Sequence, residues 1–175
     1  DLLGGGRVTA TAKIVVNATG AWSPVTAGLG GARTKVRPGK GIHVVYDRRA
    51  SNYAVVSYTI DGRQIFLMPW GNLSWIGTTD DDFYGDLDRI HATTDEVRYL
   101  VQAVARVLPS VRTGRIIGTT AGVRPTLFEW GPLPDKLSRE HEIVDHGERD
   151  GVPGLFSLIG GKLASFRIFA EEATD

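Results

Sequence analysis

Short apolar segments rich in β-branched and aromatic residues recur along most of the chain, and one long helical pattern interrupts them. Segments of this composition, bounded by glycine, proline or polar residues, favour β-strands. They cover residues 7–20, 41–46, 53–60, 63–79, 115–127, 142–146 and 155–161. Within 63–79, Gly71 and Asn72 separate two apolar arms, which predicts a hairpin with its turn at these residues.

The long helix is predicted to begin at Thr93. Thr93 and Glu96 have the spacing of a capping box, and Pro109 marks the exit. The apolar residues between them fall on one helical face: Val97, Leu100, Val101, Val104 and Leu108. A second helix is predicted over 163–173. Mostly strands with one long helix indicate an α+β fold with a largely antiparallel sheet.

Composition excludes several classes of function. The 175 residues are 42% hydrophobic and 23% charged, typical of a soluble globular protein, and no run approaches the roughly 18 apolar residues of a membrane helix. The absence of cysteine excludes disulfides and zinc–thiolate sites. A formal net charge of zero argues against a general nucleic-acid binder, so no nucleic-acid partner is expected.

Carboxylates are grouped at Asp80, Asp81 and Asp82, after an apolar segment. Consecutive carboxylates on a strand or turn point apart, so helix capping or solvation is favoured and no metal site is expected. The two ends of the sequence also look cut. Residues 1–20 resemble the last strands of something begun earlier, and Asp175 stops inside a helical pattern. We therefore expect a piece of a longer chain.

Glycines and cations mark the candidate ligand-binding positions. The last strand ends at Gly160 and Gly161, and Lys162 follows directly. Exposed backbone beside a cation suits an anion or a flat cofactor, although an ordinary strand-to-helix turn has the same pattern. His43 stands at a strand entrance, and Arg124 precedes a proline that fixes the backbone beside it. An arginine held in this way can present its planar fork to a carboxylate or phosphate.

A complete dinucleotide-binding fingerprint is missing. "GLGGAR" at residues 28–33 has only part of the glycine pattern and neither follows a clear strand nor opens a clear helix. The chain is therefore not expected to contain a whole dinucleotide-binding fold.

Six motifs occur in a familiar order: "VVNATGAW", "KGIHVV", "IGTTDDDFYGD", "AGVRP", "SRE" and "IGGKLASFR". Together they resemble the FAD-dependent glycerol-3-phosphate dehydrogenases, within the flavoprotein class that includes the D-amino-acid oxidases. The resemblance spans residues 14–175. It implies an α+β fold, with a mostly antiparallel substrate-domain sheet and the later strand and helix segments of an FAD-binding α/β domain. It also implies three parts: residues 1–33 and 123–175 in the FAD-binding domain and 34–122 in the substrate-binding domain.

The resemblance also implies roles for individual residues. His43 is the expected proton acceptor, and Arg124, Arg139 and Lys162 are expected to bind substrate, with Arg124 and Lys162 also placed in the catalytic centre. The residues expected to contact FAD, the last four through backbone N–H groups, are Ala18, Thr19, Gly20, Gly160, Gly161, Lys162 and Leu163. The sequence departs from the family at Ala164, Ser165 and Phe166, where hydroxyl-bearing residues are usual, and at Ile42, where a small polar residue is common.

The implied reaction is oxidation of sn-glycerol 3-phosphate to dihydroxyacetone phosphate, with hydride transfer to FAD and electrons passed to a quinone. The expected enzyme is a homo-oligomer in the cytoplasm, and any membrane contact is expected to be peripheral, at the inner face of the cell membrane. Two alternatives stay open. One is a related FAD-dependent amino-acid or hydroxy-acid oxidase. The other is a non-catalytic sheet module when the segment is isolated, because the pyrophosphate site is missing and the isolated segment is expected to be inactive.

Overall fold

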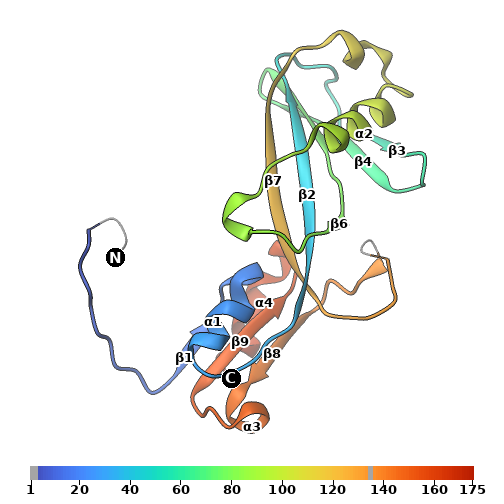
Figure 1. The fold of residues 1–175 in the computed structure, drawn as a ribbon. Coiled ribbons are helices and arrows are strands. Elements are labelled where there is room, and N and C mark those ends of the chain that lie inside the picture. Colours follow the sequence, from blue (N-terminus) through green and yellow to red (C-terminus); the bar gives the residue numbers. More distant parts are fainter. Residues whose placement is uncertain (1–3, 134–135) are drawn as a thin grey trace.

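The computed structural model describes residues 4–133 and 136–175, and these residues form two sheets (Figure 1). The smaller sheet has three strands in the order β1 (Val15–Asn17), β9 (Leu155–Gly160), β8 (His141–Asp145). The larger sheet has the order β3 (Val55–Tyr58), β4 (Gln64–Trp70), β5 (Leu73–Gly77), β2 (Val36–Tyr46), β6 (Asp81–Asp82), with β7 (Ile116–Leu127) also paired to β2. Among the described strands only β1 and β9 pair in parallel, which confirms the predicted α+β class with mostly antiparallel sheets.

The helices are few and mostly short. The α-helices are α1 (Ser23–Leu29), α2 (Thr94–Val104), α3 (His146–Asp150) and α4 (Phe166–Glu172). Single 3-10 turns are η1 (Gly20–Trp22), η2 (Leu87–Arg89), η3 (Pro109–Thr113) and η5 (Leu163–Ser165). In the described residues no helix is long and apolar enough to cross a membrane.

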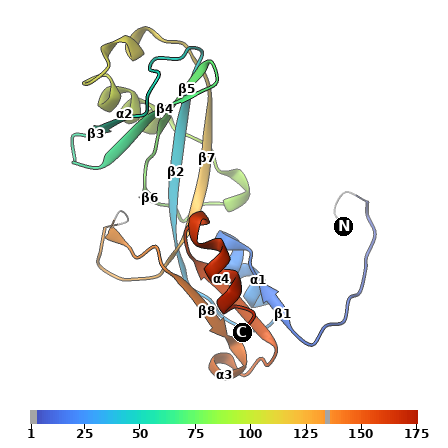
Figure 2. The same cartoon turned by 180° about the vertical axis from the view of Figure 1, so that it is seen from behind.

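The long strands β2 and β7 connect the two halves of the structure (Figures 1 and 2). They pair antiparallel from Val36–Leu127 to Val45–Gly118, and a register shift follows at Tyr46. β7 passes through the predicted boundary at residue 123 without a break. The division into three parts remains a proposal, and residues 1–3 and 134–135, which fall in its first and third parts, lie outside the described residues.

The two faces of the larger sheet have different neighbours. Side chains alternate along β2, so Ile42 and Val44 face one way and Gly41 and His43 the other. The first face packs against α2 and forms the main core, whose fully buried members include Ile42, Val44, Ile65, Leu67, Ile76, Leu100 and Val104. Core packing therefore fixes which residues of β2 point to the opposite face.

The cap of α2 matches the sequence prediction and anchors the helix to β2. The Thr93 Oγ1 accepts from the Glu96 N–H at 3.3 Å, and the Glu96 carboxylate accepts from the Thr93 N–H at 2.7 Å. The same carboxylate pairs with Lys40 on β2 at 2.8 Å. Burial alone would raise the pKa of Glu96, but the hydrogen bonds from Lys40 and Thr93 hold it below its ordinary value.

A buried polar chain joins the elements of the smaller sheet. Asn17 donates to Ser157 Oγ at 3.0 Å, and His146 links Ser157 at 2.8 Å to Asp150 at 2.5 Å. A serine, a histidine and an aspartate in this order resemble a hydrolytic triad. Ser157 and His146 are both fully buried, however, so no substrate can reach the hydroxyl. The chain is a structural link between β1, β9 and α3.

The structure corrects one predicted strand and adds one helix that was not predicted. The strand predicted from residue 7 is wrong before Val15, because residues 7–14 are exposed and pair with no strand in the described part of the chain. A strand-like composition does not make a strand where no partner edge is present. The helix α1 was not predicted, although Pro24 in its first turn is a known signal for a helix start.

Replacing the capping residue of α2 is expected to loosen that helix. In the complete protein, Thr93→Ala removes the hydroxyl that accepts from the Glu96 N–H but keeps the Thr93 N–H; it should destabilise α2 by about 1 kcal/mol, so its amides exchange with solvent roughly fivefold faster. The matched control is Thr94→Ala at the next, exposed position, which should leave exchange unchanged. Equal protection of α2 in wild type and Thr93→Ala would contradict the assigned cap.

Candidate functional site

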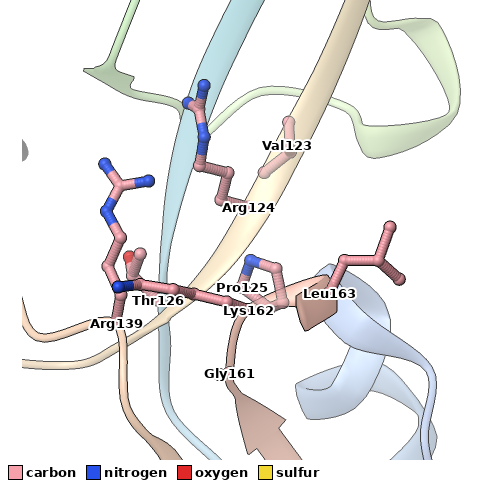
Figure 3. Close-up of a pocket in the computed structure, with 9 residues that line it drawn as sticks. Val123, Arg124, Pro125, Thr126, Arg139, Gly161, Lys162 and Leu163 are labelled. Atoms are coloured by element: carbon pink, nitrogen blue, oxygen red, sulfur yellow. The ribbon is translucent and has the colours of Figure 1, made fainter. Parts of the chain in front are cut away.

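Two cavities lie on either side of Arg124. The first, which we call the arginine cavity, has a volume of about 410 Å³ and lies between the end of β7 and the turn after β9 (Figure 3). Its lining consists of Val123, Arg124, Pro125, Thr126, Arg139, Gly160, Gly161, Lys162 and Leu163. The second, the histidine cavity, has about 450 Å³ and is lined by Gly41, His43, Trp75, Thr78, Thr120, Ala121, Gly122, Val123 and Arg124. Arg124 is thus common to both.

The guanidinium of Arg124 is held almost entirely by the protein. Its Nη1 donates to the carbonyl oxygen of Thr79 at 3.3 Å, to that of Gly39 at 3.5 Å and to Asp80 Oδ1 at 3.1 Å. Its Nη2 donates to Thr78 Oγ1 at 3.1 Å. These bonds point the fork across β2 and give it a fixed position before any ligand binds.

Asp80 joins Arg124 to Arg139. One carboxylate oxygen accepts from Arg124 at 3.1 Å, and the other accepts from Arg139 Nη2. The Asp80 side chain is 11% exposed. The sequence interpretation of Asp80 as a capping or solvated residue was therefore wrong, because the chain after β5 turns this carboxylate inward between two guanidiniums. In the described residues no group of side chains could hold a metal ion.

His43 lies on the same face of the larger sheet as Arg124. Its ring centroid is 5.8 Å from that of Trp75 on the neighbouring β5. Burial, and secondly the positive charge of Arg124, hold the pKa of His43 below its ordinary value of 6.5. Both effects favour the neutral imidazole, the form that is able to accept a proton.

Glycines make the room for these side chains. A Cβ atom at Gly77, opposite His43 in the pairing of β2 with β5, would lie 2.2 Å from the His43 ring. A Cβ atom at Gly41 would lie 2.4 Å from Arg124 Nη2. Directly opposed residues of an antiparallel pair share a face, so a glycine opposite a large side chain leaves it space to lie across the sheet.

The double-glycine turn has a structural reason of its own. Gly160 and Gly161 have φ values of 74° and 81°, and a Cβ at Gly160 would lie 2.4 Å from the carbonyl oxygen of Glu140. The Gly161 N–H donates to that carbonyl at 2.9 Å, and the Lys162 N–H donates to Ser165 Oγ at 3.2 Å. Two of the N–H groups expected to contact flavin are thus bonded within the chain.

What the turn presents to the arginine cavity is bare backbone and two exposed side chains. Lys162 is exposed, and Leu163 is 91% exposed. Figure 3 shows Lys162 extending from the turn on the side where Arg139 and Thr126 lie. A backbone surface without side chains, with the apolar Leu163 beside it, suits a flat ring, and the ammonium of Lys162 adds positive charge.

The small-residue turn after β1 lies near the same cavity. Gly20 has a φ of 60°, and the nearest atom to a Cβ built there is Pro125 Cγ at 3.9 Å. Ala18 and Thr19 are exposed, and Thr19 donates to Asn17 Oδ1 at 2.7 Å. The turn therefore keeps open backbone beside the proline that lines the arginine cavity.

The structure thus brings together most of the predicted site. Arg124, Arg139 and Lys162 share the arginine cavity, whereas His43 lies in the histidine cavity across Arg124. Of the departures from the family pattern, Ile42 is fully buried on the opposite face, so it does not alter the site. Ser165 Oγ donates to the Lys162 carbonyl at 2.8 Å and helps to form the turn.

Sequence reasoning missed Asp80, Gly77, Gly41 and Thr78 as site residues. The alternation of side chains along β2, β5 and β7 would place Gly77 opposite His43 and Gly41 beside Arg124. This signal can be used only once the strand pairing is known. The inward turn of Asp80 depends on the loop after β5 and has no local sequence signal.

Comparison with known proteins identifies the family. The domain family described as FAD dependent oxidoreductase (DAO) matches residues 2–165. The chain belongs to this family. It is 37% identical to a glycerol-3-phosphate dehydrogenase of Synechocystis, over all of the chain and 34% of that protein, and 38% identical to one of Mycobacterium leprae, over 93% of the chain and 28% of that protein. The chain therefore spans about a third of the length of these relatives.

Solved structures agree with this assignment. The glycerol-3-phosphate dehydrogenase from Bacillus halodurans complexed with FAD matches with a TM-score of 0.73 and 32% identity, covering 94% of the chain and 31% of that protein. A glycine oxidase from Geobacillus kaustophilus matches with a TM-score of 0.59 and 24% identity, covering 89% of the chain and 38% of that protein, and this likeness concerns the fold alone. The predicted family resemblance and the FAD cofactor of that family are confirmed.

The residues present fit a part of an FAD site. The arginine cavity has one side formed by a glycine turn without side chains, and the exposed Leu163 and Lys162 stand beside it. These groups would line the ring system of FAD, and Lys162 would favour negative charge on it. Within the described residues, no turn between a strand and a helix carries the G-x-G-x-x-G pattern of a dinucleotide pyrophosphate site.

Filling the space at Gly77 is expected to displace His43. In Gly77→Ala the new methyl group overlaps the imidazole, so the ring moves toward solvent and its pKa rises toward 6.5. NMR titration of the complete protein measures this, with the resonance assigned by its loss in His43→Gln. Gly118→Ala on β7 is the control, because a Cβ there meets nothing within 4 Å. An unchanged His43 titration in Gly77→Ala would contradict the assigned crowding.

Proposed function

We propose that the chain is the substrate-facing part of an FAD-dependent enzyme that oxidises sn-glycerol 3-phosphate to dihydroxyacetone phosphate. One observation carries the proposal: three cationic side chains from separate segments, Arg124, Arg139 and Lys162, line one cavity beside a neutral histidine. A phosphate dianion needs several fixed cations, whereas a single carboxylate needs one arginine. The names of the 37–38% identical relatives point to the same substrate.

Arg139 and Lys162 are the groups most available to the phosphate. Arg124 already donates to four acceptors, but Arg139 gives only its Nη2 to Asp80 among the hydrogen bonds of the described residues. Nε and Nη1 of Arg139 are left for ligand oxygens. Arg124 contributes mainly fixed positive charge and orients the substrate between the two cavities.

His43 is the proposed proton acceptor. The C2 hydroxyl of the substrate would donate its proton to the imidazole as the carbonyl forms, and Gly77 and Gly41 leave room for the ring and for Arg124 beside it. FAD, when bound, supplies the acceptor for the hydride that leaves C2. The proton thus leaves the hydroxyl oxygen and the hydride leaves C2, which becomes the carbonyl carbon.

Several expectations about the whole protein belong to the same proposal. They are the quinone acceptor, the homo-oligomer and a peripheral contact with the inner face of the cell membrane. All three concern the whole protein, and the chain spans about a third of the length of its relative from Synechocystis. The related amino-acid or hydroxy-acid oxidase remains the second candidate, supported by the DAO family match. A non-catalytic module is the third, since the described residues contain no pyrophosphate turn.

The first test is the visible spectrum of the complete protein, recorded before and after anaerobic addition of glycerol 3-phosphate. Bleaching of a flavin band is expected, because the substrate reduces FAD and no oxygen is present to reoxidise it. Glycine and lactate serve as controls and should leave the band unchanged.

Each other result has a definite meaning. A band that bleaches with an amino acid or hydroxy acid but not with glycerol 3-phosphate would move the function to the second candidate. A folded complete protein without any flavin band would support the non-catalytic module.

The role of His43 predicts the acid limb of the pH profile. A base must be neutral to accept a proton, so activity is lost as pH falls through the pKa of His43, and the midpoint in kcat/KM should lie below 6.5. In His43→Gln this limb should disappear and kcat should fall by about 10²- to 10⁴-fold. His91→Gln, at an exposed histidine, is the control. A limb that persists in His43→Gln would assign the base elsewhere.

A further inference from the structure

Asp80 is the one acidic side chain in contact with the proposed phosphate-binding cations among the described residues. Its two oxygens are divided between two partners, Oδ1 accepting from Arg124 and Oδ2 from Arg139. Gly39 leaves the space that this carboxylate occupies, because a Cβ at Gly39 would lie 2.9 Å from Asp80 Oδ1. A partly buried bridging carboxylate in a site for an anionic ligand calls for a physical role.

The two arginines depend on Asp80 to different degrees. Arg124 keeps three other acceptors, on Gly39, Thr78 and Thr79, so its position survives without the carboxylate. Arg139 has Asp80 as its only hydrogen-bond partner within residues 4–133 and 136–175, and it lies in the irregular segment between β7 and β8. Loss of the carboxylate therefore frees Arg139 and leaves Arg124 in place.

We propose that Asp80 is a positioning residue that fixes Arg139 against Arg124 and so sets the affinity of the site for a phosphate. This proposal rests on the proposed function of the site. The carboxylate separates two guanidiniums that would otherwise repel each other, and it uses only one nitrogen of Arg139. Arg139 lines the arginine cavity, and the orientation of its remaining nitrogens is then already fixed, which lowers the entropy lost when a phosphate binds.

A competing role predicts the opposite result. If Asp80 simply occupied the place of the ligand phosphate, removing its charge would strengthen anion binding. The geometry favours positioning, because Asp80 accepts from both guanidiniums but does not line the arginine cavity, which Lys162 lines. With Arg124 and Arg139, Asp80 lines a separate cavity of about 480 Å³. The sign of the effect on KM therefore separates the two roles.

The test is a double-mutant cycle in the complete protein, with Asp80→Asn, Arg139→Ala and the double variant. Asp80→Asn keeps the shape of the side chain and removes its charge. The KM for glycerol 3-phosphate should rise about tenfold or more with kcat changed less than threefold, since the lost interaction concerns binding. The double variant should bind no more weakly than Arg139→Ala alone, because Asp80 acts through Arg139.

Two further variants test whether the effect on KM is specific to the Asp80 carboxylate. Asp81→Asn is the matched control, as this neighbouring carboxylate pairs with Arg63 at 2.9 Å, and its KM should be unchanged. Gly39→Ala pushes the Asp80 carboxylate aside without removing it and should raise KM in the same direction, which keeps the test valid if Asp80→Asn fails to fold. Flavin absorbance and melting temperature check that each variant is intact.

The results that would overturn the role of Asp80 differ from those that would overturn the proposed function. A rise in KM that multiplies with that of Arg139→Ala, or a fall in KM, would overturn the role of Asp80 while glycerol 3-phosphate remained the substrate. If wild type does not oxidise this substrate, the same cycle is measured with inorganic phosphate by calorimetry, where Asp80→Asn and Arg139→Ala should weaken binding non-additively. A wild-type protein that binds no phosphate would overturn the proposal as well.

Discussion

Backbone hydrogen bonding between β2 and β7 fixes the position of most side chains in the candidate site. The pairing runs from Val36–Leu127 to Val45–Gly118, so the main core on one face and the site on the other share one register. A shift of one residue would turn His43 into the core and Ile42 into the site. Burial of Ile42 and Val44 against α2 thus also specifies the orientation of the catalytic candidate.

The parts of the fold that sequence could predict are those with a strong local signal. The capping box at Thr93, the hairpin at Gly71 and the apolar strands all correspond to observed elements, because each depends on neighbouring residues. The pairing of β1 with β9 has no such signal, since Val15 and Leu155 are brought together by the whole fold. For the same reason the strand-like composition of residues 7–14 was misleading: it favours an extended conformation but supplies no partner strand.

The site shows a similar division between residue type and geometry. The family motifs pointed to His43, Arg124, Arg139 and Lys162, and three of these share a cavity. The motifs did not show that Arg124 is largely bonded within the protein, or that the Gly161 and Lys162 N–H groups have partners inside the chain. Such facts depend on which carbonyl or carboxylate lies opposite, and this follows from tertiary pairing.

The positive charges of the site come from both sheets. Arg124 comes from a strand of the larger sheet, Lys162 follows the last strand of the smaller one, and Arg139 belongs to the segment that returns between them. Three cations near one cavity repel one another, so the site needs an internal anion or a bound one to be stable. Asp80 supplies one negative charge and leaves a net positive charge for a ligand. A phosphate dianion completes the neutralisation, whereas a carboxylate monoanion leaves it incomplete.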